Sequence, residues 1–375
     1  MVKLTPPMGW NSWNTYGEDI NEQLIKETAD AMVAEGLLDK GYEYLVIDDC
    51  WSLKERDENE RLVADPVKFP NGMKAVADYV HSKGLKFGMY SCAGNLTCAG
   101  YPGSFEHEFI DAETFAEWGV DFLKYDYCYH SPIIPGQYLY RRMGLALENC
   151  GRDILFSACS WGADETHEWI KTSSASMWRS TGDIVDEWAS VKNLTKQQEK
   201  LHAYNGVGCF NDMDMLIVGM YGKGNVGLSG CNDTQYKTHF SIWSLLGSPL
   251  MIGCDIRNMT DATKAILTNE EMIRINQDSA CRQPVRLKGI VGEDMILYSR
   301  QLENGDIAIG CFNMSENKGI ARLNLDELGL PFSTGRTLKL KEVWTGEESI
   351  VKNSTLIKKL EPFDCAVYRA EVIKA

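Results

Sequence analysis

Eight short apolar or aromatic runs alternate with longer helical patterns between residue 8 and about residue 260, and this alternation constrains the fold most strongly. Strands that alternate with helices favour a parallel sheet, and eight such units are typical of a closed (β/α)8 barrel. A doubly wound open sheet, which usually has fewer strands, is the alternative. The eight runs are MGWNSW (8–13), YLVIDDC (44–50), KFGMYSC (86–92), FLKYDYC (122–128), ILFSACS (154–160), SMWRSTGD (176–183), CFNDMDML (209–216) and SPLMIGCD (248–255).

After Asp278 the pattern changes to a period of two. Segments such as DMILYSRQL, DIAIGCFNM, LKLKEVWTG and CAVYRAE alternate apolar and polar residues, and turn residues such as those at 303–305 separate them. This pattern predicts antiparallel strands packed as a small β-sandwich. We therefore expect two domains: an α/β domain with a (β/α)8 TIM barrel over 1–279, and an antiparallel β domain over 280–375.

The net charge of the chain is −15, from 53 acidic and 38 basic residues. Nucleic acids and anionic membranes need basic surfaces on their partners, so the charge argues against both. No run approaches the roughly 18 apolar residues that span a membrane. The first 14 residues lack the apolar segment of a secretory signal. We expect a cytoplasmic protein, or a secreted one if a leader has been removed, and leave a homo-oligomer open.

Polar side chains gather where the predicted barrel strands end. Because active sites of (β/α)8 barrels lie at the carboxyl ends of the strands, we expect these side chains to converge on one rim. In the fourth run, Lys124, Asp126 and Cys128 share a face, since alternate residues of a strand point to the same side. The rim residues are Trp10 and Trp13, Asp48 and Asp49, Tyr90, Lys124 and Asp126, Arg179 and Asp183, Asp212 and Asp214, and Asp255.

The residue types on this rim exclude several chemistries. No histidine lies at a strand end, no Ser-His-Asp arrangement is evident, and no glycine-rich phosphate loop appears. The twelve cysteines contain no CxxC pair or zinc-type spacing, so we predict no metal and no cofactor. Carboxylates flanked by aromatic rings suit the cleavage of glycosidic bonds, in which two carboxyl groups take different roles. A small carbohydrate is therefore the expected partner.

Each polar group also has another interpretation. Asp48 and Asp49 could hold Mg²⁺, and Asp212 with Asp214 could bind Ca²⁺, because hard cations prefer carboxylate ligands. Arg179 and Asp183 could form a structural ion pair at the barrel mouth. At the level of function, the alternatives are a sugar-binding barrel without catalysis and a metal-dependent lyase or isomerase.

The ordered motifs MGWNSW, YLVIDDCW, FGMYSCAGNLTCAGYPGS, FLKYDYC, WRSTGDI, NDMDMLIVG and SPLMIGCDI to INQD resemble the α-galactosidase and α-N-acetylgalactosaminidase family, family 27 of the glycoside hydrolases. The resemblance runs over nearly the whole barrel, and the β domain fits it. It implies a retaining enzyme that removes terminal α-D-galactosyl residues by double displacement. Asp126 would be the nucleophile and Asp183 the acid/base.

The resemblance also implies the remaining site residues. Asp48 and Asp49 would hold the 6- and 4-hydroxyls of the sugar, and Lys124 and Arg179 would contact ring hydroxyls. We expect Lys124 to favour the ionised form of Asp126, and a less polar setting to keep Asp183 protonated. Trp13 and Tyr90 would line the pocket, Asp214 and Met215 would lie at its rim, and Cys98 and Cys128 correspond to the cysteine pair of the family.

The choice of sugar is expected to depend on the segment after the fifth strand. Small Ser160 and Ala163 resemble the N-acetylgalactosaminidase version, which leaves room for a 2-acetamido group. Trp161 and the glycine after it continue like the plant and microbial galactosidases. Galactose is therefore the first prediction and N-acetylgalactosamine the alternative. A β-L-arabinopyranosidase is disfavoured, because Asp48 suits a 6-hydroxyl that arabinose lacks.

Overall fold

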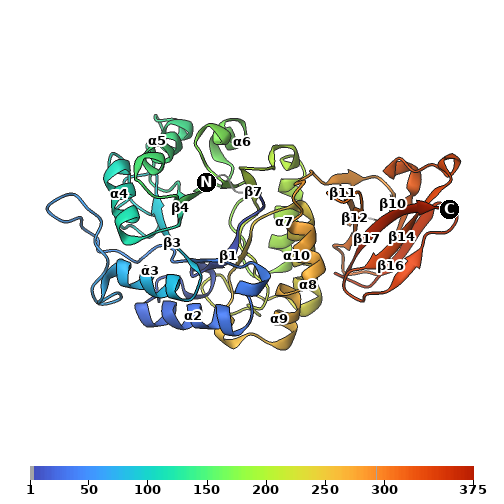
Figure 1. Ribbon diagram of the computed structural model, residues 1–375, viewed down its shortest axis with the longest axis horizontal. Coiled ribbons are helices and arrows are strands. Elements are labelled where there is room, and N and C mark those ends of the chain that lie inside the picture. The colour runs from blue at the N-terminus through green and yellow to red at the C-terminus, as the bar shows by residue number, and fades with distance from the viewer. Residues whose placement is uncertain (1–3, 293) are drawn as a thin grey trace.

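Eight parallel strands form one sheet in the first part of the computed structural model, which describes residues 4–292 and 294–375 (Figure 1). The spatial order is β7-β6-β5-β4-β3-β2-β1-β8, and every neighbouring pair is parallel. The strands are β1 (Met8–Asn11), β2 (Tyr44–Val46), β3 (Lys86–Cys92), β4 (Phe122–Asp126), β5 (Leu155–Cys159), β6 (Met177–Arg179), β7 (Phe210–Asp212) and β8 (Leu250–Ile252).

The sheet closes between its two outer strands through Leu216, which follows β7. The Leu216 N–H donates to the carbonyl of Met251 at 2.7 Å, and the Leu216 carbonyl accepts from Gly253 N–H at 3.0 Å. Leu216 thus pairs in parallel with β8. Each strand lies within one of the eight predicted runs, so the barrel prediction is confirmed and the open sheet is wrong.

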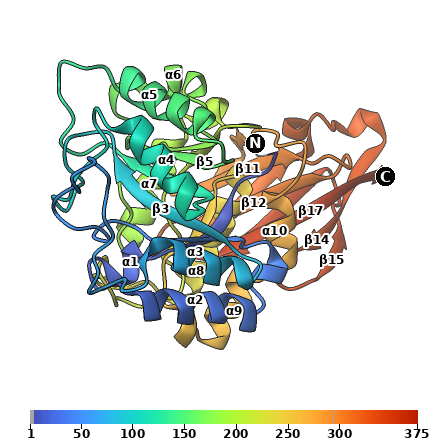
Figure 2. The ribbon, with the colours of Figure 1, turned by 60° about the vertical axis from the view of Figure 1, so that its left-hand side comes forward.

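Helices cover the outside of the strands (Figure 2). They are α1 (Trp13–Tyr16), α2 (Glu22–Ala34), α3 (Gly72–Ser82), α4 (Glu108–Trp118), α5 (Gly136–Asn149), α6 (Thr166–Trp169), α7 (Trp188–Gln198), α8 (Asp233–Leu246), α9 (Asp261–Leu267) and α10 (Glu270–Asn276). Short 3-10 helices lie at η1 (Leu38–Lys40), η2 (Ala163–Glu165), η3 (Ile170–Thr172), η4 (His202–Tyr204), η5 (Ile256–Asn258), η6 (Leu325–Leu328) and η7 (Phe332–Thr334). No helix in the described part of the chain is long and apolar enough to cross a membrane.

Strand β4 illustrates how the sequence separates the two faces of the barrel wall. Leu123 and Tyr125 point outward into the core shared with the helices, where the Tyr125 ring lies 5.6 Å from that of Tyr140 on α5. Phe122 points inward and packs in the barrel interior. Lys124 and Asp126 follow Phe122 on the inner face at intervals of two residues. The alternation therefore delivers both charged side chains to the open end of the barrel.

The second domain consists of two antiparallel sheets around a separate hydrophobic core. The larger sheet has the order β15-β14-β17-β12-β11-β9 and the smaller one the order β10-β13-β16. The four predicted segments become β11, β12, β14 and β17. The strands are β9 (Val285–Leu287), β10 (Ile290–Val291), β11 (Met295–Gln301), β12 (Ile307–Asn313), β13 (Gly319–Asn324), β14 (Arg336–Glu342), β15 (Glu348–Ile350), β16 (Thr355–Leu360) and β17 (Cys365–Lys374).

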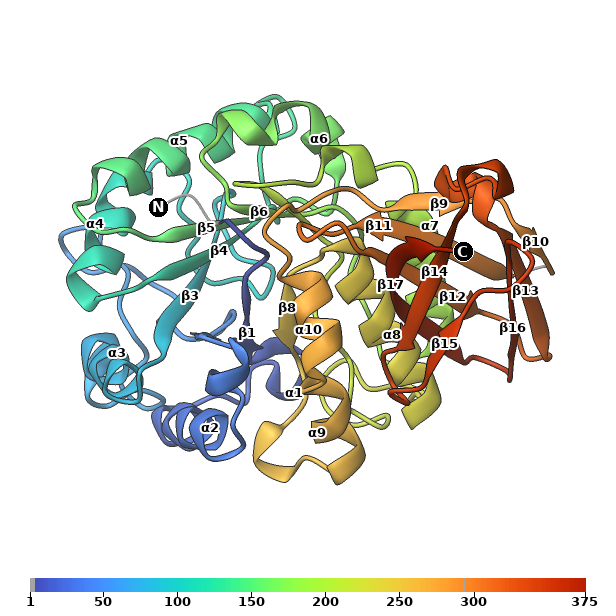
Figure 3. The same ribbon diagram turned by 45° about the vertical axis from the view of Figure 1, so that its right-hand side comes forward.

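Helices α8 and α10 form the side of the barrel that faces the β domain (Figures 1 and 3). Glu271 of α10 pairs with Lys341 of β14 at 3.0 Å and with Arg369 of β17 at 3.2 Å. Across the same interface, Thr238 Oγ1 of α8 donates to the Phe363 carbonyl at 2.7 Å. The predicted boundary at 279/280 falls between α10 and β9 and stays a prediction.

Candidate active site

A cavity of about 220 Å³ opens at the carboxyl ends of the barrel strands, where catalytic sites of this architecture lie. Twelve of the fifteen predicted site residues line it. The lining residues are Trp13, Asn14, Asp48, Asp49, Tyr90, Cys98, Lys124, Asp126, Trp161, Arg179, Asp183, Ile184, Val185, Asp214, Met215 and Val226.

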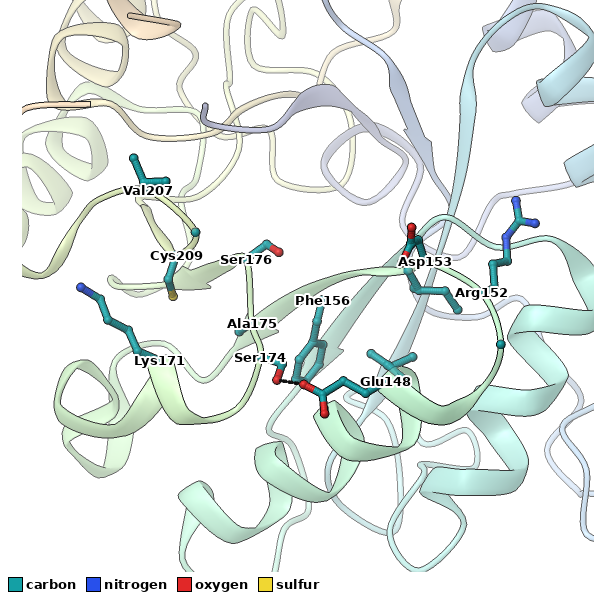
Figure 4. Close-up of a pocket in the computed structure, with 15 residues that line it drawn as sticks. Glu148, Arg152, Asp153, Phe156, Lys171, Ser174, Ala175, Ser176, Val207 and Cys209 are labelled. Atoms are coloured by element: carbon teal, nitrogen blue, oxygen red, sulfur yellow. Dashed lines mark hydrogen bonds between the residues drawn. The ribbon is translucent and has the colours of Figure 1, made fainter. Parts of the chain in front are cut away.

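A larger hollow of about 780 Å³ lies at the opposite end of the barrel, where β5, β6 and β7 begin (Figure 4). Ile154, Ser176 and Cys209, each directly before one of these strands, contribute to its wall. In Figure 4 the Ser174 hydroxyl donates to the Glu148 carboxylate at the edge of this hollow. The catalytic side chains predicted from the sequence lie at the other end of the strands.

Asp126 lies at the end of β4 and is buried, with 6% of the residue exposed. The Tyr90 hydroxyl donates to its Oδ2 at 3.0 Å, and the Tyr127 N–H donates to its Oδ1 at 2.9 Å. Burial raises the pKa of Asp126 to about 6, although the positive charge of Lys124 acts to lower it. Lys124 was expected to dominate, but desolvation is the larger effect. A substantial share of Asp126 is therefore protonated at mildly acidic pH, near 6, in the free site.

Lys124 makes its closest ionic contact with Asp48, which follows β2, one strand beyond the neighbour of β4. Its Nζ lies 2.8 Å from Asp48 Oδ2, which also accepts from Asn11 Nδ2 at 2.7 Å. The other Asp48 oxygen accepts the Asp49 N–H at 3.0 Å. The oxygens of Asp49 accept the N–H groups of Cys50 and Ala99 at 2.7 and 2.9 Å.

These contacts bear on the proposed Mg²⁺ site. Both oxygens of Asp48 and both of Asp49 already accept hydrogen bonds from N–H groups, and one of those donors is the ammonium of Lys124. A cation here would have to displace Lys124 and face its charge. Asp214 is likewise paired with a guanidinium, that of Arg179 at 3.1 Å. The donor set fits a hydroxyl-bearing ligand better than a hard cation.

Arg179 joins two carboxylates at the mouth of the cavity. Its Nη2 donates to Asp183 Oδ1 at 2.8 Å, while its Nη1 lies 3.1 Å from Asp214 Oδ1. The Asp214 carboxylate also accepts the Ile184 N–H at 2.7 Å, which fixes the backbone directly after Asp183. The arrangement combines the predicted ion pair with the predicted site, because the same Arg179 lines the cavity.

The setting of Asp183 differs from the expected one. Its side chain is 73% exposed, whereas that of Arg179 is buried. Local desolvation acts to raise the pKa of Asp183, but the charge and the hydrogen bond of Arg179 outweigh it and hold the pKa below its usual range. The less polar environment predicted for Asp183 is therefore wrong for the free site, since the guanidinium stabilises the ionised form.

Cys98 and Cys128 are joined as a disulfide with their Cα atoms 5.1 Å apart. The bond connects the loops that follow β3 and β4, and the Tyr90 hydroxyl lies 3.3 Å from Cys98 Sγ. Cys98 lines the cavity, whereas Cys128 is not among the lining residues. The described chain brings Cys98, Cys128 and Asp126 close together, but the two sulfurs bind each other.

The described chain does not bring Ser160 and Ala163 to the cavity wall. Ser160 is fully buried, and its hydroxyl lies 2.7 Å from that of Thr166. Ala163 packs against the barrel core, and its N–H donates to the Ser160 carbonyl. Trp161, between them, is the residue that reaches the cavity. Of the three predicted residues in this segment, the cavity lining contains only Trp161, and the role of Ser160 and Ala163 beside the sugar stays a prediction.

Three expected rim residues turn to other partners, and four lining residues were not predicted. Trp10 lies in the hydrophobic core, where its Nε1 donates to the Cys254 carbonyl at 2.9 Å. Asp212 accepts the Asp214 N–H at 2.9 Å, and Asp255 binds the Arg257 side chain at 2.9 Å. Two of the missed residues, Asn14 and Ile184, directly follow predicted ones, and Val185 is the next residue along, so sequence proximity was the available signal. Val226 has no such signal, because its N–H reaches the Asn14 carbonyl from a distant loop. The missed residues are Asn14, Ile184, Val185 and Val226.

Comparisons with known proteins agree with this architecture. Residues 5–278 match the family described as "Alpha galactosidase A", and residues 292–370 match the "Alpha galactosidase C-terminal beta sandwich domain". The α-galactosidase of Cyamopsis tetragonoloba is 41% identical over 365 residues, which cover 97% of this chain and 85% of that relative.

Solved structures extend the similarity to three dimensions. The α-galactosidase I of Mortierella vinacea has a TM-score of 0.92 and 34% identity, with 98% of this chain and 97% of that one covered. The α-galactosidase of Saccharomyces cerevisiae with raffinose has a TM-score of 0.87 and 30% identity, with 99% and 98% covered. The cavity at the carboxyl ends of the strands, the two domains and these relatives lead to one assignment: the chain belongs to the α-galactosidase family of the glycoside hydrolases.

Proposed function

We propose that this glycoside hydrolase removes terminal α-D-galactosyl residues with net retention at the anomeric carbon. The observation that carries the proposal is the convergence of Asp126 and Asp183 on one cavity that also presents Asp48, Asp49 and Lys124. Two carboxyl groups in a cavity with further hydrogen-bonding groups match the requirements of glycoside hydrolysis. The chain's membership in the α-galactosidase family supports galactose as the sugar.

In the first step, an oxygen of the Asp126 carboxylate forms a bond to the anomeric carbon. The glycosidic C–O bond breaks as the proton of Asp183 moves to the leaving oxygen. In the second step, the Asp183 carboxylate takes a proton from water, the water oxygen binds the anomeric carbon, and the bond to Asp126 breaks. Each Asp returns to its initial protonation state.

Two basic residues of the cavity influence the protonation of Asp126 and Asp183. Lys124 and Arg179 place positive charge near Asp126 and Asp183, which favours carboxylate forms during the reaction. In the free site the single proton of the pair favours Asp126, because burial raises the pKa of Asp126 while Arg179 lowers that of Asp183. Substrate that engages Arg179 would weaken its hold on Asp183 and favour transfer of the proton to the acid/base position.

A retention assay with a matched variant tests this function. Proton NMR of the earliest product from nitrophenyl α-galactoside should show the α-anomer, and Asp126→Ala should lose turnover while the folded state persists by circular dichroism. Formation of the β-anomer first, or full activity in Asp126→Ala, contradicts the mechanism. A chelator should leave the rate unchanged, which separates the hydrolase from the metal-dependent lyase or isomerase. A purely sugar-binding barrel would bind galactose and release no nitrophenol.

The second candidate sugar is N-acetylgalactosamine, from the sequence around Ser160. The buried position of Ser160 weakens this basis, since its side chain contacts Thr166 and not the cavity. Parallel rate measurements on nitrophenyl α-galactoside and nitrophenyl α-N-acetylgalactosaminide decide between the sugars.

We keep the cytoplasm as the proposed location, and the redox state of Cys98 and Cys128 provides a test of it.

A further inference from the structure

Trp161 reaches the cavity from a segment with an uncommon backbone conformation. Its φ angle is +56°, and those of Asp164 and Glu165 in the same segment are +52° and +50°. Residues other than glycine rarely adopt this left-handed backbone conformation, and they keep it only where surrounding contacts enforce it. Three such residues lie within five positions, and one of them lines the cavity. Contacts with the surrounding structure must therefore hold this segment in its conformation.

Asp164 provides those contacts. Its Oδ2 accepts the Tyr127 hydroxyl at 2.5 Å and the Gly136 N–H at 3.2 Å. Its backbone carbonyl accepts Trp169 Nε1 at 2.6 Å. Tyr127 directly follows Asp126, and its ring lies 6.4 Å from that of Trp161 at an angle of 64°. One carboxylate therefore ties the end of β4 to the segment that carries Trp161.

Gly136 is the first residue of α5, and the local geometry requires a glycine there. A Cβ atom at this position would lie 2.7 Å from the Tyr127 hydroxyl and 3.2 Å from Asp164 Oδ2. Pro135 before it forms no side-chain cap of the helix. The Asp164 carboxylate takes the place of such a cap, because it accepts an N-terminal N–H and places negative charge at the positive end of the helix. Helices α5 and α6 lie side by side in Figures 1 and 2.

We infer that Tyr127, Asp164 and Gly136, here called the latch, position Trp161 in the wall of the sugar-binding cavity and thereby set the affinity for galactose. Tyr127 and Asp164 are positioning residues, since they act through Trp161 and through the segment after β5. The inference rests on the proposed function for the identity of the sugar. It adds residues that determine affinity and lie behind the cavity, not on its surface.

The latch can be tested with variants that remove one hydrogen-bonding group each. Tyr127→Phe keeps the ring and removes the hydroxyl, and Asp164→Ala removes the acceptor. Asp164→Asn retains an acceptor oxygen and a residue type that tolerates left-handed backbone, so it serves as the rescue variant. Tyr79→Phe is the matched control, because the Tyr79 hydroxyl contacts the Asp30 carboxylate at 2.9 Å far from the cavity.

The dissociation constant for galactose is measured by titration calorimetry, and KM and kcat are measured on nitrophenyl α-galactoside. The loss of one hydrogen bond to a charged group leads us to expect the galactose dissociation constant to rise about fivefold or more in Tyr127→Phe and in Asp164→Ala. KM should rise by a similar factor, while kcat changes about twofold at most. Asp164→Asn and Tyr79→Phe should stay near the parent protein. The dissociation constant of the double variant should be no higher than that of the single variant that binds galactose more weakly, since the two groups form one contact.

A merely structural role would lower the fraction of folded protein and leave the dissociation constant of the folded fraction unchanged. An unchanged dissociation constant in both single variants therefore overturns the inference. Failure of the proposed function is recognised separately, because the parent protein would then release no nitrophenol, whereas the calorimetric comparison needs no turnover. If the parent binds no galactose at all, both the proposed sugar and the role assigned to the latch are wrong.

Discussion

The Arg179 guanidinium donates a hydrogen bond to Asp183 at 2.8 Å, and it holds the pKa of this exposed carboxyl below its usual range. Burial raises the pKa of Asp126 to about 6. Asp126 and Asp183 are therefore separated in acidity, and over an acidic range of pH this pair carries one proton. Such a separation of two carboxyl groups is what a retaining glycosidase needs, although the free site places the proton on Asp126.

The acidity of the pair predicts the pH dependence of kcat/KM on nitrophenyl α-galactoside. In the proposed mechanism the singly protonated pair is the active form, so activity should fall as the pH rises through the pKa of about 6 that belongs to Asp126. At low pH it should fall only below the usual range of aspartate, where Asp183 also gains a proton. A pH–rate profile that is flat between pH 5 and 8 would contradict this assignment, since about 6 lies within that interval.

Lys124→Gln tests the origin of the alkaline limb. Lys124 lowers the pKa of Asp126, so removal of its charge should move the limb to higher pH. The absolute rate should also decrease, because Lys124 lines the cavity. Lys74→Gln is the control, since Lys74 forms an exposed pair with Asp78. An alkaline limb that stays in place in Lys124→Gln would show that another group controls it.

The loss of rate in Asp183→Ala should depend on the leaving group of the substrate. A general acid contributes about 10²–10⁴-fold where the leaving oxygen needs a proton. We therefore expect a loss of this size on an alkyl α-galactoside and a much smaller loss in the first step with nitrophenyl α-galactoside, whose phenolate leaves without help. Rates on the two substrates, measured before product accumulates, give the comparison. Equal losses on both substrates would argue that Asp183 has another role.

The barrel could be predicted because its signals are local. Each inner strand is a short apolar run, and the polar residues at its end mark the rim, as in Phe122 to Asp126. The smaller sheet of the β domain was not predicted. Strand β10 spans two residues, and β16 carries Lys358 and Lys359 among its apolar positions, so neither forms a clear run. Their positions depend on pairing with β13, which is a long-range contact.

The sequence predicted most of the residues that form the site, but not their exposure, their ion pairs or their backbone conformations. Asp126 and Asp183 both reach the cavity, as their places after β4 and β6 indicate. The exposure of Asp183 and its pairing with Arg179 depend on side-chain directions that the sequence does not encode locally. Ser160 and Trp161 are adjacent, yet the left-handed backbone at Trp161 places only its side chain at the cavity. Such conformations arise from tertiary contacts such as those of Asp164.

The buried pair of Lys124 and Asp48 predicts a large stability effect. The Asp48 side chain is 2% exposed, so Asp48→Ala would leave the Lys124 charge buried without its partner. We expect the free energy of unfolding to fall by about 3–5 kcal/mol, measured by urea denaturation. Asp78→Ala removes the partner of the exposed Lys74 and should change it by about 1 kcal/mol at most. Similar small losses in both variants would mean that water or another group compensates Lys124.

The disulfide between Cys98 and Cys128 predicts both a chemical and a thermodynamic result. Peptide mapping of the purified, air-oxidised protein without reductant should recover the two residues as one linked species, with the other ten cysteines as thiols. Because the bond closes a loop across 30 positions, its removal in Cys98→Ser/Cys128→Ser should lower the free energy of unfolding by about 4 kcal/mol in the chain-entropy account. Cys150→Ser replaces a half-buried free thiol and is the control. Recovery of both cysteines as thiols from cells would support the cytoplasmic location, since that compartment keeps thiols reduced, whereas the linked species would favour an oxidising one.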